Sequence, residues 1–252
     1  MGKGIGERLR AYAEKDGRGY PDWALRYLPV ARRLRPVLRE DARVLEIGAN
    51  ENGLARFTGV RTICVDVARA HLAAARTAQP VLPVVADAGA LPFRDGVFEV
   101  CACMDTFEHF SAETRERAVL EIVRVTAASG IAAVGFPSGE AAMRAEEVIR
   151  KAYFASCGRQ LKWLEEHAQF PLPDAREIAA LFALHAGPVR RIAVDKNANV
   201  RVWTFMWRIL MCGWPGRGNA LCQVILRWCT PLLCRMHVGT CYRAIVWMEP
   251  KP

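Results

Sequence analysis

Short apolar segments bounded by turn-forming residues alternate with amphipathic segments along most of this chain. A strand covered on both faces is a run of about four to eight apolar residues, whereas a helix repeats apolar residues three and four positions apart. The predicted strands are residues 44–47, 62–67, 81–86, 97–104, 131–136, 189–194 and 241–248. The predicted helices between them are residues 68–75, 112–127, 139–157, 162–167 and 174–183. This alternation favours an α/β fold with a mostly parallel sheet.

The N-terminal segment, residues 1–43, is predicted to be helical. Residues 5–16 and 22–40 have apolar positions at helical spacing with arginines between them, and Pro29 and Pro36 are expected to split the second stretch. We expect these helices to pack beside the first strand. The arginines have two interpretations, a solvated basic face or a segment that closes over a ligand.

The composition favours one large domain over residues 1–252, because 52% of the residues are hydrophobic and can fill a full core. The net charge of +9 is uneven: residues 1–43 carry eleven basic and six acidic groups, and residues 186–252 carry ten and two. The nine cysteines lie in apolar runs without a Cys-x-x-Cys pair, and no signal-peptide pattern is found. Reduced cysteines of this kind predict a cytoplasmic protein.

A carboxylate interrupts the first predicted strand, at Glu46 in the stretch Val-Leu-Glu-Ile-Gly-Ala-Asn-Glu-Asn-Gly of residues 44–53. A charge in a buried strand costs roughly several kcal/mol unless it is paired or hydrogen-bonded. Glu46 therefore either faces a ligand or ties down its own loop. The spacing Gly48-x-Asn50-x-x-Gly53 also imitates the dinucleotide-binding fingerprint.

Acidic residues also follow the next three strands. Asp66 ends the second strand, Asp87 follows the third and Asp105 follows the fourth. Ligands of doubly wound sheets bind outside the carboxyl ends of the strands, so a carboxylate at Asp66 can accept both hydroxyls of a ribose. The alternative is that Asp66 caps the helix at residues 68–75.

These residues together resemble the motifs of class I S-adenosylmethionine-dependent methyltransferases. Residues 44–48 resemble the family's apolar strand, acid and glycine turn, and residues 87–93, Asp-Ala-Gly-Ala-Leu-Pro-Phe, resemble the motif whose acid meets the adenine amino group. Residues 105–110, Asp-Thr-Phe-Glu-His-Phe, resemble the segment after the fourth strand. The resemblance reaches about residue 136 and implies S-adenosylmethionine as the cofactor. The cofactor-binding residues that it implies are Glu46, Gly48, Ala49, Asn50, Gly53, Asp66, Asp87, Ala88 and Asp105.

The resemblance also implies a Rossmann-like, doubly wound α/β fold. Its seven-stranded sheet would be mostly parallel, with the last strand antiparallel between the fifth and the sixth. Residues 44–137 would form the cofactor-binding half. Helical insertions at residues 138–172 and 202–237 leave the carboxyl ends of parallel strands, so we expect them to roof the substrate pocket. The alternative is that these helices only extend the core.

The loop departs from the family pattern at its later glycine positions. Asn50 and Asn52 occupy these positions, and Gly53 falls one place late. Asparagine takes left-handed backbone angles more readily than most other residues, so the turn can form. The departure keeps open a non-catalytic cofactor-binding protein of the same fold.

Glu108 and His109, after the fourth strand, are the candidate catalytic residues. A sulfonium methyl group is already activated, so alignment of the reactants is the main task and can supply roughly 7–11 kcal/mol. An oxygen or nitrogen nucleophile can also need a base, for which a histidine with a pKa of about 6.5 is suited. The alternative is that His109 orients the backbone, and His167 in the first insertion is a second candidate base. No zinc-cluster spacing is found, so no metal is predicted.

Residues 202–237 combine arginines with many apolar residues. Their longest uncharged run, residues 218–226, has nine residues, against about 20 needed to span a bilayer. This composition is typical of an interfacial helix on anionic lipid, and the alternatives are core packing or a dimer contact. The tryptophans that could lie at the lipid surface are Trp203, Trp207, Trp214 and Trp228.

The leading functional hypothesis is methyl transfer from S-adenosylmethionine to a small-molecule or lipid-linked acceptor. An NAD(P)-dependent oxidoreductase is the alternative enzyme, although the segments at Asp87 and Asp105 argue against it. RNA methylation is disfavoured, because the chain has no aromatic-basic RNA motif and no Asn-Pro-Pro-Tyr-type segment. We therefore expect no nucleic-acid partner, and a peripheral contact with the cytoplasmic membrane surface through residues 202–237.

Overall fold

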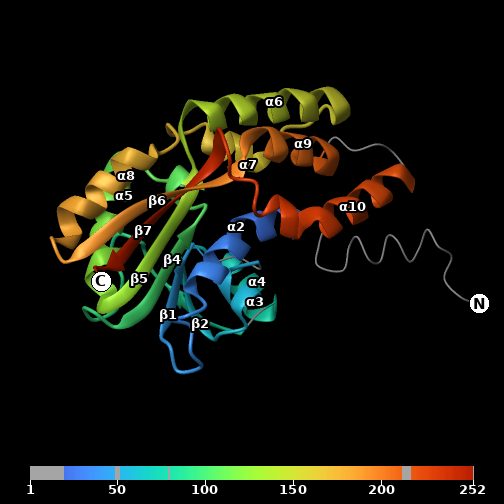
Figure 1. Cartoon of the computed structure of the whole chain (residues 1–252). Helices are drawn as coiled ribbons and strands as arrows, with labels where there is room; N and C mark the ends of the chain where they lie inside the picture. The colour runs from blue at the N-terminus through green and yellow to red at the C-terminus, as the bar shows by residue number, and fades with distance from the viewer. Residues whose placement is uncertain (1–19, 49–51, 79, 212–216, 252) are drawn as a thin grey trace, which may run out of the picture.

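The computed structural model describes residues 20–48, 52–78, 80–211 and 217–251, which contain one seven-stranded sheet (Figure 1). The strand order is β3-β2-β1-β4-β5-β7-β6. The pairs on the β3 side of β5 are parallel, whereas β7 pairs antiparallel with both β5 and β6. The predicted Rossmann-like sheet, with its last strand antiparallel between the fifth and sixth, is confirmed. The strands are β1 (Val44–Ile47), β2 (Thr62–Asp66), β3 (Val81–Val85), β4 (Phe98–Met104), β5 (Thr126–Pro137), β6 (Arg190–Asn199) and β7 (Cys241–Pro250).

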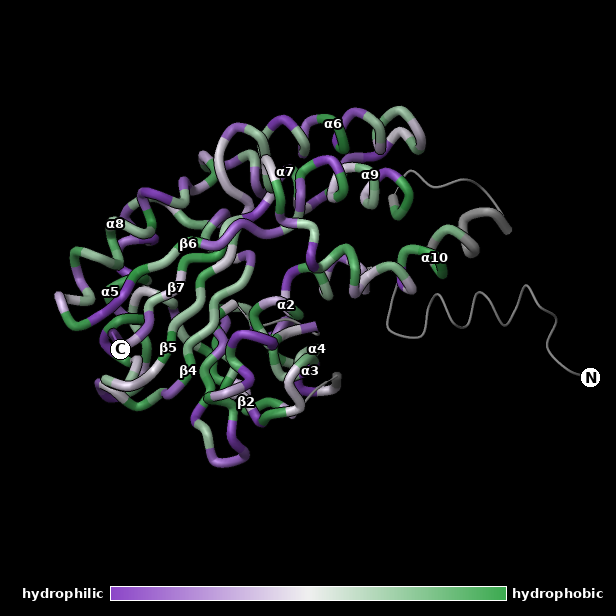
Figure 2. The backbone as a smooth tube through the Cα atoms, in the orientation of Figure 1, coloured by the Kyte–Doolittle hydropathy of each residue, from purple (hydrophilic) through white to green (hydrophobic). Residues whose placement is uncertain are grey.

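The central strand β4 shows why this sheet is buried on both faces. Its successive side chains point to opposite faces, so Cys101 and Cys103 join one hydrophobic cluster while Val100 and Ala102 join another. None of the four is more than 1% exposed. The two cysteines are therefore core residues. Figure 2 colours much of β4 and of the neighbouring β5 as hydrophobic.

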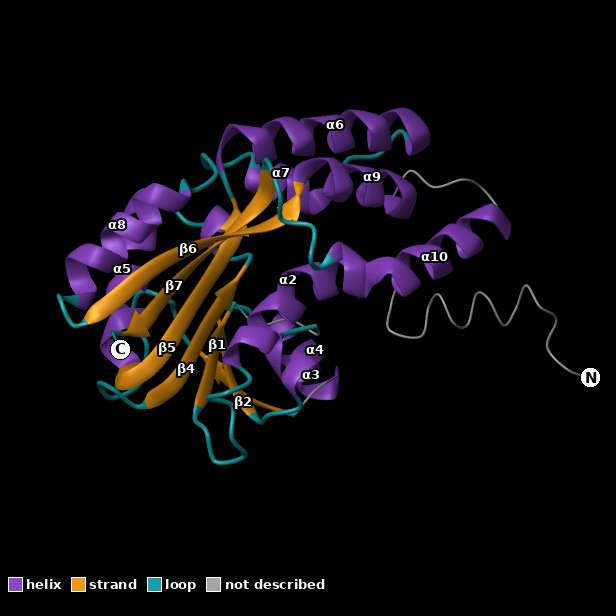
Figure 3. Ribbon diagram, viewed as in Figure 1, coloured by secondary structure: helices purple, strands orange, loops and turns teal. Residues whose placement is uncertain are grey.

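Helices cover both faces of the sheet (Figure 3). Residues of α5 and α8 pack in the cluster that contains Cys101, and residues of α2 and α3 pack in the cluster that contains Val100. α4 packs against β2 and β3. These helices are α2 (Tyr20–Leu34), α3 (Leu54–Thr58), α4 (Arg69–Ala78), α5 (Ala112–Val125) and α8 (Ala175–Ala186).

α2 runs through Pro29, so the predicted break at this residue is wrong. A proline inside a helix costs about 3 kcal/mol because it removes a hydrogen bond and its ring clashes with the preceding turn. Leu25, Val30 and Leu34 on either side are at most 1% exposed, and each buried side chain of this size contributes about 1.5–3 kcal/mol. Packing on the sheet therefore outweighs the local preference. The predicted helix at residues 5–16 lies outside the described residues.

The two insertions form helices that pack on one another beyond the sheet (Figure 1). The first contains α6 (Gly139–Cys157) and α7 (Lys162–His167), and the second contains α9 (Val200–Met211) and α10 (Arg217–Leu233). A separate hydrophobic cluster joins them to the start of α2 and the start of β7. Its largest members include Leu164, Trp203, Met206, Trp207 and Tyr242.

The second insertion divides into a buried and an exposed part. Trp203 and Trp207 on α9 are only 0% and 9% exposed, so the prediction that they lie at a lipid surface is wrong and the core alternative holds for them. Trp228 on α10 is 73% exposed. Trp214 lies outside the described residues. Among the helices of the described chain, none is long and apolar enough to cross a membrane.

Candidate functional site

A cavity of about 500 Å³ lies between the carboxyl ends of the strands and the inserted helices. Its strand side is formed by the residues at the ends of β1, β2 and β4, and its roof is formed by α7 and α9. The insertions therefore roof this cavity, as expected from the topology. The cavity is lined by Asp22, Trp23, Arg26, Gly48, Asp66, His71, Asp105, Thr106, Glu108, His109, Trp163, His167, Trp203, Trp207, Tyr242 and Arg243.

Gly48 forms the turn at the end of β1 and exposes bare backbone to the cavity. Its φ of +77° lies in the left-handed region, and its N–H donates to the carbonyl of Val65 at 2.8 Å. A Cβ at this position would lie 1.9 Å from Oγ1 of Thr106. Both the backbone angle and the close approach therefore require glycine. Ala49 and Asn50, the next predicted cofactor residues, lie outside the described residues.

Glu46 holds the loop from below and does not line the cavity. The side chain is fully buried, and its two oxygens accept from the N–H of Leu54 at 2.9 Å. A Cβ on Gly53 would lie 2.4 Å from Oε2 of Glu46, so Gly53 lets the carboxylate reach the start of α3. Burial raises the pKa of Glu46 to about 7. These contacts favour the alternative in which Glu46 ties down its own loop.

Asp66 bonds to the backbone at the start of α4 and also lines the cavity. Its Oδ1 accepts from the N–H of Ala68 at 2.7 Å, as expected of a residue that begins a helix. Its Oδ2 lies 3.4 Å from Nδ1 of His71, and both residues line the cavity. The carboxylate therefore keeps an oxygen that faces a ligand site.

Asp87 and Ala88 lie apart from this cavity. The Asp87 carboxylate accepts from the N–H of Gly89 at 2.7 Å and lies 3.8 Å from Arg117, and its side chain is 54% exposed. Ala88 is buried in the core. An adenine contact at Asp87 would thus form at the outer edge of the site, beside β3.

Asp105 forms a buried ion-pair network that the sequence does not predict. Its Oδ2 lies 2.6 Å from both Arg26 and Arg243, and Arg26 also pairs with Asp22 at 3.1 Å. Burial alone would raise the pKa of Asp105, but the guanidiniums of Arg243 and Arg26 hold it below its ordinary value. The spacing of Asp22 and Arg26 indicates a pair along one helix. Arg243, however, joins them only through the pairing of β7 with β5.

Aromatic rings form the roof of the cavity. Trp203 stacks on Tyr242 with ring centroids 3.5 Å apart, and Trp163 lies 5.1 Å from Trp207. The indole N–H groups of Trp203 and Trp207 both donate to Oδ1 of Asp22, at 3.2 and 3.1 Å. These bonds fix the rings, so the roof is a rigid apolar wall with a charged edge. The sequence did not identify these residues as a binding wall.

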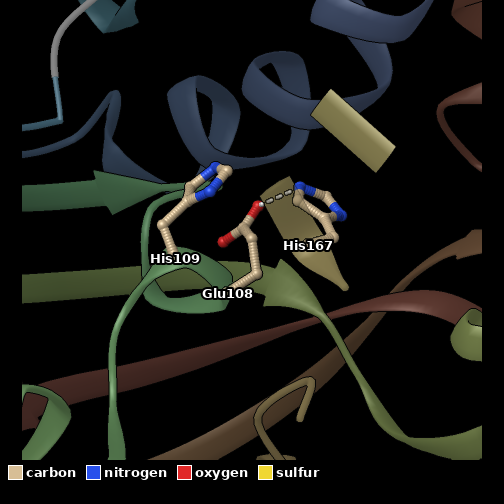
Figure 4. A group of neighbouring side chains, drawn as sticks. All are labelled: Glu108, His109 and His167. Atoms are coloured by element: carbon tan, nitrogen blue, oxygen red, sulfur yellow. Dashed lines mark ion pairs between the residues drawn. The ribbon is translucent and has the colours of Figure 1, made fainter. Parts of the chain in front are cut away.

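Glu108, His109 and His167 lie together beside this roof (Figure 4). Glu108 and His109 belong to the short helix η1 (Phe107–His109), and His167 ends α7. Nε2 of His167 lies 3.7 Å from Oε1 of Glu108, and the two imidazole centroids are 5.0 Å apart. The fold therefore joins both candidate catalytic residues and the second candidate histidine in one cluster.

The three groups have shifted pKa values. Burial and the charge of Asp105 raise the pKa of Glu108 to about 8. Burial would lower the pKa of His167, but its hydrogen bond to Glu146 and the charge of Glu108 raise it. Burial and the charge of His167 lower the pKa of His109. The His109 imidazole is therefore neutral near pH 7 and can accept a proton.

Several buried polar atoms on cavity-lining residues have no hydrogen-bond partner. They include Nε of Arg26, both carboxylate oxygens of Glu108 and the indole nitrogen of Trp163. Buried polar groups are nearly always satisfied, and each orphan costs about 1–3 kcal/mol. The cavity is thus suited to a ligand that brings polar groups to these atoms and places an apolar body against the indoles.

Residues 45–134 match a protein family described as a methyltransferase domain. A curated relative, the malonyl-acyl-carrier-protein O-methyltransferase of Geobacter sulfurreducens, is 37% identical over 101 residues. That match covers 36% of this chain, and the chain spans little more than a third, 37%, of the length of the relative.

Solved structures resemble the chain over most of its length. An S-adenosylmethionine-dependent methyltransferase from Thermotoga maritima superposes with a TM-score of 0.57 at 15% identity, covering 96% of this chain and 98% of the other. The cyclase SpnF superposes with a TM-score of 0.55 at 16% identity, covering 89% and 82%. Identities this low establish a shared fold alone.

Proposed function

Because the chain carries a class I S-adenosylmethionine-dependent methyltransferase domain, we propose that it transfers a methyl group to a small acceptor bound under the inserted helices. The observation that carries this proposal is a single cavity that reaches both Gly48 and Asp66 on the strand side and the indoles of the roof. A donor and an acceptor in one cavity can be aligned for direct displacement. We propose that residues 1–252 form one domain.

The strand side of the cavity fits the cofactor of this family. S-adenosylmethionine supplies a methyl group that its sulfonium makes electrophilic. Gly48 and Asp66 both line the cavity, so we propose that the ligand lies against the backbone of Gly48 and that Oδ2 of Asp66 accepts its hydroxyl groups. Glu46 and Gly53 would keep the loop in position from below, and Asp105 would hold the turn after β4. Further cofactor contacts are proposed for Ala49, Asn50, Asp87 and Ala88.

The roof side supports an acceptor with a flat apolar body and polar groups. Trp163, Trp203 and Trp207 provide the apolar wall, and the unpaired atoms of Arg26 and Glu108 provide polar contacts. The curated relative acts on a malonyl group attached to a carrier protein, so an acidic acyl acceptor is one class to test. An acidic group could accept a hydrogen bond from Nε of Arg26, which has no other partner among the described residues.

His109 is the residue that we propose to accept a proton from the acceptor when the nucleophile is an oxygen or a nitrogen. It lines the same cavity as Glu108, and its lowered pKa leaves the imidazole neutral near pH 7. A positioned base of this kind contributes roughly 10²–10⁴ to a rate. The Glu108 side chain is more deeply buried than that of His109. Glu108 would therefore take part in the reaction only if the acceptor touched its carboxylate.

Mass spectrometry of the material that copurifies with the protein tests this function. We expect S-adenosylmethionine or its demethylated product, and incubation with labelled cofactor and candidate acids should yield a labelled methyl ester. Cofactor binding without labelled product from any copurified compound would favour the non-catalytic alternative. Tightly bound NAD(P) in its place would contradict the proposal.

We further propose that α10 brings the enzyme to an anionic membrane surface, where a lipid-linked acceptor could enter. Ile225, Trp228 and Leu232 are 52%, 73% and 62% exposed and recur at the spacing of one helix face. Figure 2 shows hydrophobic residues recurring along this helix. Residues 186–252 carry ten basic and two acidic groups, which favours anionic lipid.

A further inference from the structure

The side chains of Glu108, His109 and His167 lie close enough together for the cluster to hold one metal ion. One ligand atom from each residue, a carboxylate oxygen and two imidazole nitrogens, lies within 4.8 Å of the other two. The residues come from η1 and from α7, which the first insertion brings together across the cavity. In Figure 4 the Glu108 carboxylate lies between the two imidazoles.

Glu108 is the first reason to assign a ligand to this cluster. Its side chain is 0% exposed, and neither carboxylate oxygen has a hydrogen-bond partner. Its nearest opposite charge is His167, whose Nε2 is 3.7 Å from Oε1, longer than a hydrogen bond. A buried carboxylate without hydrogen bonds is costly unless something else binds it. A cation placed between the carboxylate and the imidazoles would satisfy both oxygens.

The orientation of His167 is the second reason. Its Nδ1 lies 2.9 Å from Oε1 of the buried Glu146, and the hydroxyl of Tyr242 donates to the same oxygen at 2.7 Å. These contacts assign the Nδ1 proton to the Glu146 side, so Nε2 faces Glu108 and would bind a metal ion that displaces its proton. Histidines that bind metals usually donate their other N–H to a carboxylate in this way, which fixes the ring and its tautomer.

We propose that Glu108, His109 and His167 bind one divalent transition-metal ion, with Glu146 as the positioning residue for His167. Two imidazoles and one carboxylate suit Zn²⁺, Fe²⁺ or Mn²⁺ better than Mg²⁺ or Ca²⁺, which prefer oxygen ligands. Three protein ligands leave coordination positions open toward the cavity. This assignment revises the sequence interpretation, in which no metal was predicted, because the histidine from the insertion is distant in sequence.

If the protein transfers methyl groups as proposed above, the metal ion would determine which acceptors bind. An ion in this position would bind an oxygen of the acceptor directly, such as a carboxylate, a phenol or an enol. His109 would then serve as a ligand in place of a base. The acceptor class becomes a compound with an oxygen donor and an apolar body that fits beneath the indoles.

Calorimetric titration of untagged, chelator-treated protein with Zn²⁺, with Co²⁺ absorption as a second readout, tests the site. We expect one ion per chain and visible Co²⁺ bands of nitrogen and oxygen coordination. Glu108→Gln and His167→Gln should each weaken binding by about 100-fold or more, and Glu146→Gln by about 10–100-fold. His185→Ala is the matched control, because His185 forms another pair with a glutamate, Glu116, at 3.7 Å on α8 and α5.

Circular dichroism and melting curves of the same variants establish that they are folded. A wild-type protein that binds no ion would overturn the assignment, and the cluster would then be an ion pair only. Binding that persists in folded Glu108→Gln and His167→Gln variants would also overturn it. These titrations contain no cofactor or acceptor, so the metal site and the proposed methyl transfer can fail separately.

Discussion

The two sides of the cavity are built in different ways. The strand side consists of a glycine turn and carboxylates at strand ends, and two of these carboxylates bond to a backbone N–H two residues on, Asp66 to Ala68 and Asp87 to Gly89. Asp105 is the exception, because distant arginines hold it. The roof consists of side chains from distant elements that hold one another, such as Asp22 between two indoles. Local geometry thus fixes the proposed cofactor side, whereas tertiary packing fixes the acceptor side.

This difference implies that single substitutions around the proposed acceptor change the reaction rate more than cofactor binding. His109→Ala should lower the turnover rate by roughly 10²–10⁴, through loss of a base or of a metal ligand, with little change in cofactor affinity. Steady-state kinetics with an identified acceptor, together with calorimetry for the cofactor, measures both. A fully active variant would remove His109 from the mechanism.

The strand side should show its own signature in the pH dependence of stability. Glu46 has an ordinary pKa of 4.5 and a folded pKa of about 7, so the folded state binds the proton more tightly. The free energy of unfolding therefore falls by a few kcal/mol as the pH rises from about 4.5 to about 7.

Urea unfolding of Glu46→Gln at about pH 5 and about pH 8 checks this sign. The variant keeps an acceptor for the N–H of Leu54, so its stability relative to wild type should improve at the higher pH. Glu140→Gln is the control, because Glu140 is 82% exposed on α6. If the stability difference between Glu46→Gln and wild type were the same at both pH values, the pKa of Glu46 would not be raised by burial.

Alanine substitutions at Gly48 and Gly59 distinguish the effect of backbone strain from an effect on cofactor binding. Both have positive φ, at +77° and +73°, but a Cβ would clash with Thr106 only at Gly48. Gly59→Ala should cost about 1–3 kcal/mol of stability through strain, and Gly48→Ala should cost more because of the clash with Thr106. Only Gly48→Ala should also weaken cofactor binding, and equal binding by the two variants would argue against a ligand at this turn.

The same contrast explains what the sequence predicts. The strands and the insertions follow from hydrophobic periodicity. The strand order and the roles expected of Gly48, Asp66 and Glu108 follow from the resemblance of short motifs to a known family. Arg243, Asp22 and Trp203 have no local signal, because they meet only when β7 pairs with β5 and α9 packs on α2. The path of α2 through Pro29 was missed for the same reason, since buried neighbours outweigh the local preference.

The smallest expected effect concerns α10. Trp228→Glu should reduce cosedimentation with anionic vesicles at low salt, because an exposed indole and nearby arginines favour that surface. Leu184→Glu is the matched control, since Leu184 is 71% exposed on α8. Wild-type protein that stays in the supernatant would rule out the membrane proposal and leave the enzyme with a diffusible acceptor.

Calorimetric titration with S-adenosylmethionine and its demethylated product tests the central claim most directly. Wild type should bind both at one site, and Asp66→Ala should weaken binding by about 1–3 kcal/mol, the scale of hydrogen bonds to a charged group. His185→Ala should bind like wild type. A wild-type protein that binds neither compound, or that binds NADH tightly at this site, would contradict the account.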